Sequence, residues 1–549
     1  MSAGVRRAAR WYDNAVFYGL DVGLFKDGNG DGVGDFRGLI ESLDYLAWLG
    51  VTCLWLMPFY PTPNRDNGYD VTDYCAVDPR HGTLADFQEV VREADRRGMR
   101  VLVDLVVNHT SDQHPWFQAA RRDPRSPYRG YYVWTDNPSR ERQEKIVFPG
   151  VEDSAWEYDA VAGAYYLHHF YKFEPDLETA NPAVQQEIRR IMEFWLGLGV
   201  AGFRLDAAPY LRSGSHSAPG SQNPEDPHPL LRTLRAWCAN AQPDAVLAAE
   251  ADVAPDQLGA YFGSGDEMHL LFNFLLDEYL FLALARHSAE PVARALRLLP
   301  SRPPGGQWLN FLRNLDELDL ERLGADERAE VFRSFAPDRR MRVYDRGIRR
   351  RLAPMLGGDR RRLELAFSLL CGLPGAPLLA YGDEIGMGDN LTRPQREAVR
   401  PPMQWVNGPN AGFSTAPPAA LAAPVIARGP FGYERVNVAD QQRDAGSLLP
   451  WVRRLFHTRR ACPEIGRDAC ALLDVDEPSV VACRWSDTGS ALVTLHNLAP
   501  EPRTITLDRE SGDAWEPVFG GSAHQVIAGS PVRVTLEGYG YRWLRAGRR

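Results

Sequence analysis

Short apolar runs alternate with amphipathic segments through most of the chain. An apolar run at 15–22 precedes a segment at 35–50 whose apolar positions recur every three or four residues, a pattern that predicts a strand followed by a helix. Further strands are expected at 51–57, 101–110, 199–207, 245–251, 270–276, 309–317 and 376–386. Further helices are expected at 84–98, 182–199, 229–240 and 359–372. This alternation predicts an α/β protein with a parallel sheet, most simply closed as a (β/α)8 barrel.

Two regions break the alternation. Residues 111–181 are rich in Asp, Arg, Pro and aromatic residues without a helical period, which indicates a domain inserted after the third strand. Near the end, short β-like runs are separated by Gly, Pro and Asp. We therefore expect a barrel formed by 1–110 and 182–455, an inserted domain at 111–181, and a C-terminal antiparallel β-domain at 456–549.

Charge and cysteine usage narrow the function. The chain of 549 residues carries 62 basic and 72 acidic side chains, a formal charge of -10 that disfavours nucleic acid and anionic membranes as partners. A neutral small molecule fits better. The seven cysteines are scattered without a CxxC pair, so neither a disulfide framework nor a zinc site is predicted. No secretion signal is visible at the start, and the cytoplasm is the expected compartment.

Two other stretches could be taken for a membrane span and a nucleic-acid site, but their residues favour neither. The apolar stretch from Leu363 to Tyr381 contains Glu364 and two prolines, which disfavours a membrane span. The arginine clusters at 349–351 and 360–362 lack interleaved aromatic residues, so we interpret them as solvated helix surface rather than a nucleic-acid site.

Polar side chains follow several of the predicted strands. Catalytic groups of a (β/α)8 barrel gather at the carboxyl ends of its strands. The candidates there are Asp104, Asn108, His109, Arg204, Asp206, Glu250 and Asp316. A single carboxylate in such a place usually caps a helix or forms a salt bridge. Several carboxylates together with Arg and His are much harder to explain in that way.

Four segments carry a specific resemblance. DLVVNHT, GFRLDA, AAEAD and FLRNLDE, in this order, resemble the signature segments of the α-amylase family, glycoside hydrolase family 13. GYDVTDY, EIGMGDN and VRPPMQW resemble its trehalose synthase and oligo-α-glucosidase branch. The resemblance covers essentially the whole chain. It implies a retaining enzyme that transfers α-glucosyl groups of small α-glucosides such as maltose or trehalose, with an α-amylase or α-glucosidase type of hydrolase as the alternative.

The resemblance also assigns roles to residues. It implies that Asp206 is the nucleophile, Glu250 the general acid and base, and Asp316 a carboxylate that holds sugar hydroxyls. Arg204 stands two residues before Asp206 on the same strand, where side chains share a face, so its cation should keep Asp206 ionised.

Further residues match substrate-binding positions of the family. Tyr69 is expected to stack under the reacting glucose, and His109 is the retained histidine that follows Asn108. Asp66 and Arg400 match positions that close the non-reducing end of the pocket in members active on disaccharides.

The chain departs from the family pattern in three places. Leu315 replaces the histidine that precedes the third carboxylate, so a hydrogen bond to glucose hydroxyls is missing. The segment from Leu211 to Asp226 lacks the polar motif of trehalose synthases. The segment EPDLE, which ends at Glu178, stands where the branch usually has Gln at the start and Asn at the end. An altered enclosure of the sugar favours hydrolysis or transfer to another acceptor. A catalytically silent, amylase-fold binding or scaffold protein is the alternative of another class, but it gives no reason to retain all three carboxylates.

The loop DGNGDGVGD is the candidate metal site. Asp27, Asn29 and Asp31 alternate oxygen ligands with glycines, and the Val33 carbonyl and Asp35 are possible further ligands of a structural Ca²⁺. A glycine-rich turn capped by Asp is the other interpretation. The resemblance favours calcium, because the same loop binds it in the oligo-glucosidase branch.

The aromatic run Tyr131 to Trp134 also allows two readings. It could form a platform for sugar or the core of the inserted domain, and the sequence leaves both open.

Overall fold

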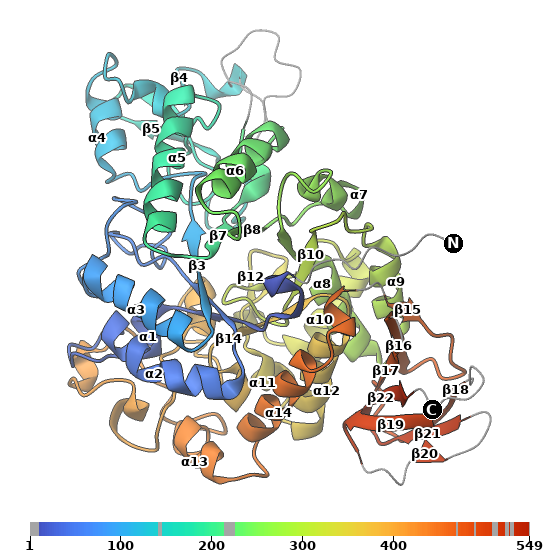
Figure 1. Ribbon diagram of the computed structural model, residues 1–549. Helices are drawn as coiled ribbons and strands as arrows, with labels where there is room; N and C mark the ends of the chain where they lie inside the picture. The colour runs from blue at the N-terminus through green and yellow to red at the C-terminus, as the bar shows by residue number, and fades with distance from the viewer. Residues whose placement is uncertain are drawn as a thin grey trace.

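The protein is described by a computed structural model that covers residues 10–140, 145–212, 226–467, 470–487, 490–507, 514–521, 526–527 and 532–547. Its centre is a closed barrel with the strand order β1-β14-β10-β9-β8-β7-β3-β2, and every neighbouring pair is parallel (Figure 1). The strands are β1 Phe17–Leu20, β2 Cys53–Leu56, β3 Arg100–Leu105, β7 Gly202–Leu205, β8 Val246–Ala249, β9 Leu270–Phe272, β10 Gln307–Asn310 and β14 Ala376–Ala380. The expected (β/α)8 barrel is confirmed.

Helices that follow the strands surround the barrel. They include α2 Phe36–Leu49, α3 Leu84–Arg96, α5 Pro182–Gly197, α6 His228–Ala241, α8 Phe274–Arg286 and α12 Arg360–Gly372. Local signals fix their ends. Asp35 accepts a hydrogen bond from the Gly38 amide at the start of α2, and Gly50 ends this helix with φ 103°, a left-handed conformation that glycine adopts without a steric penalty.

One predicted strand is wrong in its extent. The apolar run 270–276 forms β9 only as far as Phe272, and α8 begins at Phe274. Asn273 separates the two elements, because its side chain accepts a hydrogen bond from the Leu276 amide and caps the helix. A short buried run does not distinguish a strand from a buried helix by its period.

The segment between β3 and α5 forms a small unit of its own. It contains helix α4 Pro115–Arg122 and a three-stranded sheet with the order β4 Trp134–Thr135, β6 Ala164–Leu167 and β5 Trp156–Asp159. Tyr131, Tyr132 and Val133 are buried, and the Trp134 ring stacks on Phe117. The aromatic run therefore belongs to the core of this segment.

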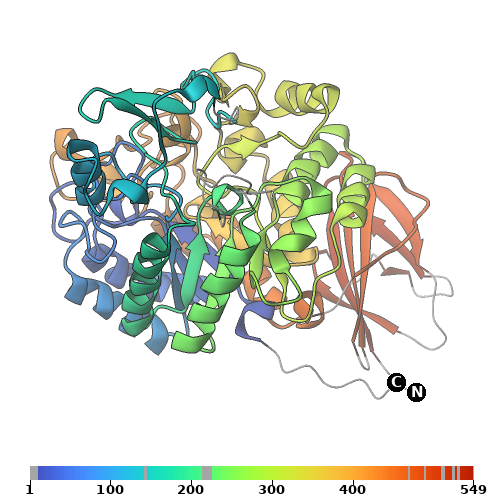
Figure 2. The same cartoon turned by 90° about the horizontal axis from the view of Figure 1, so that it is seen from above.

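The end of the chain forms two antiparallel sheets. One has the order β15 Ala471–Leu472, β16 Val480–Asp487, β17 Ser490–Asn497, β22 Tyr541–Gly547 and β19 Ala514–Phe519. The other has the order β18 Arg503–Leu507, β21 Val532–Leu536 and β20 Val526–Ile527. Both lie at one end of the molecule (Figure 2). Helix α12 contacts the first of these sheets through Ser368, whose hydroxyl lies 3.0 Å from Nε2 of His496 in β17. The expected C-terminal β-structure is confirmed.

The structure describes both the helices and the arginine clusters of the chain. Within the described ranges, every helix is too short or too polar to cross a membrane. The arginines at 349–351 are not a solvated helix surface, and that interpretation is wrong. Arg351 is buried and donates hydrogen bonds to Asp383 and to two backbone carbonyls, while Arg350 pairs with Asp389. These cations are used to hold loops together.

Candidate active site

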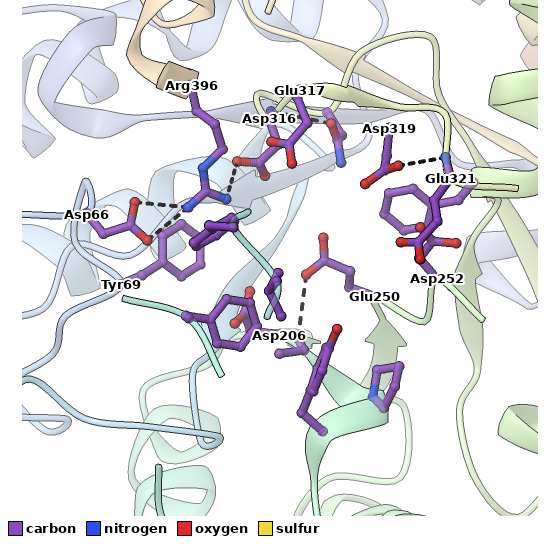
Figure 3. Close-up of a pocket in the computed structure, with 18 of the residues that line it drawn as sticks. Asp66, Tyr69, Asp206, Glu250, Asp252, Asp316, Glu317, Asp319, Glu321 and Arg396 are labelled. Carbon is purple, nitrogen blue, oxygen red and sulfur yellow. Dashed lines mark hydrogen bonds and ion pairs between the residues drawn. The ribbon is translucent and has the colours of Figure 1, made fainter. Parts of the chain in front are cut away.

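A pocket opens at the carboxyl ends of the barrel strands (Figure 3). It is lined by Asp66, Tyr69, His109, Lys145, Val147, Phe148, Phe170, Arg204, Asp206, Ala207, Pro209, Tyr210, Glu250, Asp252, Phe274, Asn314, Asp316, Glu317, Asp319, Glu321, Arg346 and Arg396. Seven of the eight expected catalytic and substrate-binding residues are on this wall, and Arg400 is the exception. Residues from the segment inserted after β3 also contribute.

Arg204 lies at the centre of the carboxylate cluster. Its guanidinium forms an ion pair with Asp206 and lies 2.8 Å from both Asp104 Oδ1 and Glu250 Oε2. Arg204 is almost fully buried, so these pairs are shielded from water and its charge acts strongly on all three carboxylates. The contact with Asp206 is the one expected from their spacing along β7.

Glu250 differs from Asp206 in its electrostatic surroundings. Burial raises the pKa of Glu250 to about 8, with Asp206 and Asp316 adding to the rise and Arg204 opposing it. A carboxyl group with this pKa remains largely protonated at neutral pH. The site therefore contains a candidate proton donor beside a carboxylate that is paired with a cation, which is the division of roles that a retaining glycosidase needs.

Asp316 is held by two arginines. Its carboxylate lies 2.6 Å from Arg400 Nη2 and 2.9 Å from Arg396 Nη1. Burial alone would raise the pKa of Asp316, but Arg396 and Arg400 outweigh it, and the pKa is lowered. Asp316 thus remains an anion that can accept hydrogen bonds from sugar hydroxyls.

The structure assigns the two arginines to different places. Arg396 lies between Asp316 and Asp66, with 2.9 Å to the nearer Asp66 oxygen, and this bridge is visible in Figure 3. Arg400 lies behind Asp316, where it also donates to the Leu315 carbonyl over 2.7 Å. The place that we expected for Arg400 beside Asp66 is therefore taken by Arg396. Arg396 lies in the short helix η8 Gln395–Val399, and no periodic pattern of residues predicts its role.

Tyr69 and His109 complete the part of the pocket near Asp66. The Arg204 guanidinium lies over the Tyr69 ring at 5.8 Å, which brings the ring beside the carboxylate cluster. The His109 ring lies against Phe170, with 5.3 Å between centroids. These aromatic surfaces can pack against the apolar faces of a sugar ring.

A second acidic group forms the opposite part of the pocket. Oxygens of Asp252, Asp319 and Glu321 lie within 4.8 Å of one another, and Figure 3 shows them beyond Glu250. Each has a cationic partner: Arg322 for Asp252 at 2.8 Å, Arg346 for Asp319 at 2.7 Å, and Lys145 for Glu321 at 2.7 Å. The sequence does not indicate this group, because Asp252 follows β8, whereas Asp319 and Glu321 lie much later in the chain, at and just after the short strand β11 Leu318–Asp319.

The departures from the family pattern have different outcomes. Leu315 is buried in the apolar core with φ 74° and is not on the pocket wall, although Asn314 and Asp316 on either side are. Glu178 is also buried and away from the wall. Most of the segment from Leu211 to Asp226 lies outside the described residues.

The candidate calcium loop is held together by its own amides. Asp27 accepts hydrogen bonds from the backbone of Asn29, Gly30 and Gly32 and from the Ser414 hydroxyl. Asp35 accepts from three amides, including that of Gly38. Asp31 accepts from the Val33 amide and from the side chain of Asn29.

The oxygen-rich residue types of this loop suit Ca²⁺. However, the carboxylate oxygens of Asp27, Asp31 and Asp35 do not all lie within 4.8 Å of one another. The carboxylate oxygens of Asp252, Asp319 and Glu321 do. The loop thus fits calcium by its residue types, and its carboxylates would have to move together to share one ion.

Comparison with known proteins agrees with this geometry. Residues 23–468 match the α-amylase catalytic domain, and residues 489–545 match the C-terminal domain of sucrose hydrolase-like proteins. The chain is 43% identical to a trehalose synthase/amylase of Mycobacterium tuberculosis over 97% of this chain and 90% of that protein. It is 41% identical to a trehalose synthase of Pimelobacter sp., over 97% of this chain and 96% of that protein.

A solved structure shows the same fold. An α-amylase from H. orenii superposes with a TM-score of 0.79 at 28% identity, covering 98% of this chain and all of that chain. The barrel, the carboxylates at the ends of its strands and the similarity along nearly the whole sequence lead to one conclusion. The chain belongs to the α-amylase family, glycoside hydrolase family 13.

Proposed function

We propose that this chain is a retaining α-glucosyl-transferring enzyme that interconverts small α-glucosides, with maltose and trehalose as the first pair to test. The observation that carries the proposal is the contrast between two neighbouring carboxyl groups. Both Asp206 and Glu250 are paired with Arg204, yet burial raises the pKa of Glu250 to about 8 in spite of this cation. One is suited to attack as an anion and the other to donate a proton.

In the first step, Asp206 attacks the anomeric carbon of the glucosyl ring while Glu250 donates its proton to the glycosidic oxygen. The glycosidic bond breaks, and an ester forms between the glucosyl group and Asp206. Asp316, held by Arg396 and Arg400, binds ring hydroxyls as the ring distorts.

In the second step, ionised Glu250 removes a proton from the acceptor while the acceptor oxygen attacks the anomeric carbon, and the ester bond to Asp206 breaks to return a free carboxylate. If the acceptor is the anomeric hydroxyl of the released glucose, the product is trehalose. If it is the 4-hydroxyl, maltose is formed again, and if it is water the result is hydrolysis. The outcome depends on how long the released sugar stays in the pocket and how much water enters.

The names of the two relatives support this choice of sugars, since both are trehalose synthases. Incubation of the purified protein with maltose, trehalose, sucrose and maltotriose, followed by chromatography of the products, tests it. We expect maltose and trehalose to be converted into each other with glucose as a minor product. Absence of turnover of all four sugars would refute the proposal.

Hydrolysis is the second candidate function. The specific observation in its favour is that the polar motif expected between Leu211 and Asp226 is missing from the sequence. Glucose as the main product from maltose, with little trehalose, would favour this candidate. Both candidates use the same first step.

Two further proposals concern a bound metal ion and the cellular compartment. We propose that the loop 27–35 binds Ca²⁺ in a structural role, on the basis of its oxygen-bearing residue types. We also propose a reducing compartment such as the cytoplasm. All seven cysteines have free thiols, which is usual in reducing compartments.

A further inference from the structure

Glu174 is a buried acid directly beside the pocket. It lies between β6 and α5 and has no solvent-exposed surface. Its Oε2 accepts a hydrogen bond of 3.2 Å from the Tyr171 amide, whereas its buried Oε1 has no hydrogen-bond partner. An unpaired buried carboxylate oxygen is costly, so the position of this atom calls for a functional explanation.

The unpaired Oε1 of Glu174 faces a second unpaired atom, which belongs to His109. Its buried Nε2 has no hydrogen-bond partner and lies 3.9 Å from Glu174 Oε1. This separation is too long for a hydrogen bond. It is short enough for a charge on the Glu174 carboxylate to act strongly on the imidazole. His109 lines the pocket and Glu174 does not, so the glutamate lies behind the histidine as seen from the ligand.

The other side of the imidazole determines where its proton lies. Asn108 Nδ2 lies 3.4 Å from His109 Nδ1 and also donates to Asp176 Oδ1 over 3.3 Å. Because an amide nitrogen only donates, Nδ1 is the acceptor in this contact, and the proton of the neutral ring is on Nε2. The imidazole N–H is therefore directed toward Glu174.

Other charges act on the same carboxyl group. Burial raises the pKa of Glu174 well above its usual value, Asp66 and Asp70 raise it further, and Arg396 opposes the rise. Arg396 is itself bound to Asp66 and Asp316, and Arg65 is bound to Asp70 and Asp112. Among these charged neighbours, His109 is the one that faces Oε1 without a competing partner.

We propose that Glu174 is a positioning residue that fixes the proton and orientation of His109, and thereby makes binding of the glucosyl ring depend on pH. As the pH rises and Glu174 loses its proton, the carboxylate holds the imidazole N–H and orders the ring. As the pH falls, Glu174 becomes neutral and this attraction is lost. The inference rests on the proposed function only in taking a glucosyl ring as the ligand.

The test is the pH dependence of KM and kcat for maltose in the wild type and in Glu174→Gln, from about pH 5 to pH 9. We expect the wild-type KM to rise about tenfold toward low pH, because the attraction of the Glu174 carboxylate for the imidazole N–H is lost when Glu174 is protonated. Glu174→Gln should have a nearly constant KM over this range, with a smaller effect on kcat. Glu174→Asp retains the charge and should partly restore the pH dependence.

Two controls separate positioning from a structural role. Glu384→Gln replaces another buried glutamate, which Tyr18 and Tyr45 hold away from the pocket, and should keep the wild-type pH dependence of KM. A double-mutant cycle of Glu174→Gln with His109→Gln should show strongly non-additive effects on kcat/KM, because Glu174 acts through His109. Additive effects, or a wild-type pH dependence in Glu174→Gln, would overturn the inference.

A binding measurement keeps this test independent of turnover. Glucose should raise the melting temperature of the wild type more at high pH than at low pH, and this difference should vanish in Glu174→Gln. If no α-glucoside is turned over but this difference is found, the proposed function fails and the role of Glu174 stands. If turnover is found without the difference, the inference fails alone.

Discussion

At the scale of single residues, the site depends on burial and charged neighbours, which give similar carboxyl groups different pKa values. Asp206, Glu250 and Asp316 are all carboxyl groups at the ends of barrel strands. Asp206 and Glu250 share Arg204, whereas Asp316 is held by Arg396 and Arg400, and burial raises the pKa of Glu250 in spite of its cation. The sequence predicted these three because polar residues that follow buried strands meet at one edge of the barrel. It could not predict Arg396, whose contact with Asp66 spans 330 positions in the sequence.

The raised pKa of Glu250 predicts the alkaline limit of activity. Because the proton on Glu250 is needed in the first step, kcat should fall above about pH 8 as the carboxyl ionises. Rates on maltose between about pH 6 and pH 10 provide the test. A kcat that stays constant across this range would contradict the assignment of Glu250 as the acid.

The same pKa predicts a stability effect. Between the ordinary pKa of 4.5 and about 8, the folded protein binds a proton at Glu250 that the unfolded chain does not, so this contribution to stability falls as the pH rises. Glu250→Gln should abolish turnover and melt higher than the wild type at pH 8. Thermal melts at pH 6 and pH 8 would show the difference growing with pH. A lower melting temperature of the variant at pH 8 would contradict this account.

Arg396 gives a prediction that the sequence alone did not. Arg396→Met removes the cation that bridges Asp66 and Asp316 and leaves two buried carboxylates without it. We expect kcat/KM to fall about a hundredfold or more, the magnitude typical of breaking a buried charge pair. Arg393→Met is a nearby control, since Arg393 pairs with Glu397 off the pocket wall. Equal effects of both substitutions would count against a specific role.

At the scale of elements, the strands place the site because their register is narrowly constrained. The pattern of apolar residues predicted the barrel strands. It made the strand at 270–276 too long, so that the predicted strand included the start of helix α8, because buried strands and buried helices both contain short apolar runs. Likewise, the expected strand at 309–317 begins earlier, at Gln307, and ends at Asn310. Leu315 then lies in a turn, which explains why its side chain enters the core instead of following the alternation of a strand.

Gly202 offers a test of the register between β7 and β8. It has φ 138°, and a Cβ at this position would lie 2.0 Å from the Val246 carbonyl oxygen. Gly202→Ala should force β7 away from β8, displace Arg204 and Asp206, and lower both stability and kcat by large factors. Thermal melts and maltose assays check this. Gly197→Ala, on the open surface of α5, is the control and should behave like the wild type.

The loop 27–35 carries the calcium prediction. A ligand that binds only the folded state stabilises it, so Ca²⁺ should raise the melting temperature without changing kcat. Asp31→Asn should weaken the effect, because Asp31 has the most exposed carboxylate of the loop. Metal carried through purification must first be excluded by elemental analysis. Equal melting temperatures with Ca²⁺ and with chelator would leave the loop as a glycine-rich turn.

At the scale of the whole molecule, distant segments come together to form a single pocket. The barrel and the C-terminal sheets were predictable from the order of strand and helix patterns. The acidic group opposite Asp66 was not, since its ion pairs join Lys145 of the inserted segment to Glu321, and Arg346 to Asp319. Such pairings depend on how loops meet in space, which has no periodic trace in the sequence.

The central claim is that a glucosyl group is carried on Asp206, and turnover by Asp206→Asn tests it most directly. The variant keeps the size of the side chain but has no anionic oxygen to attack the anomeric carbon. With the fold verified by its melting curve, turnover of maltose and trehalose should fall below about one per cent of the wild-type rate. A well-folded Asp206→Asn variant that keeps a larger share of the activity would contradict the account.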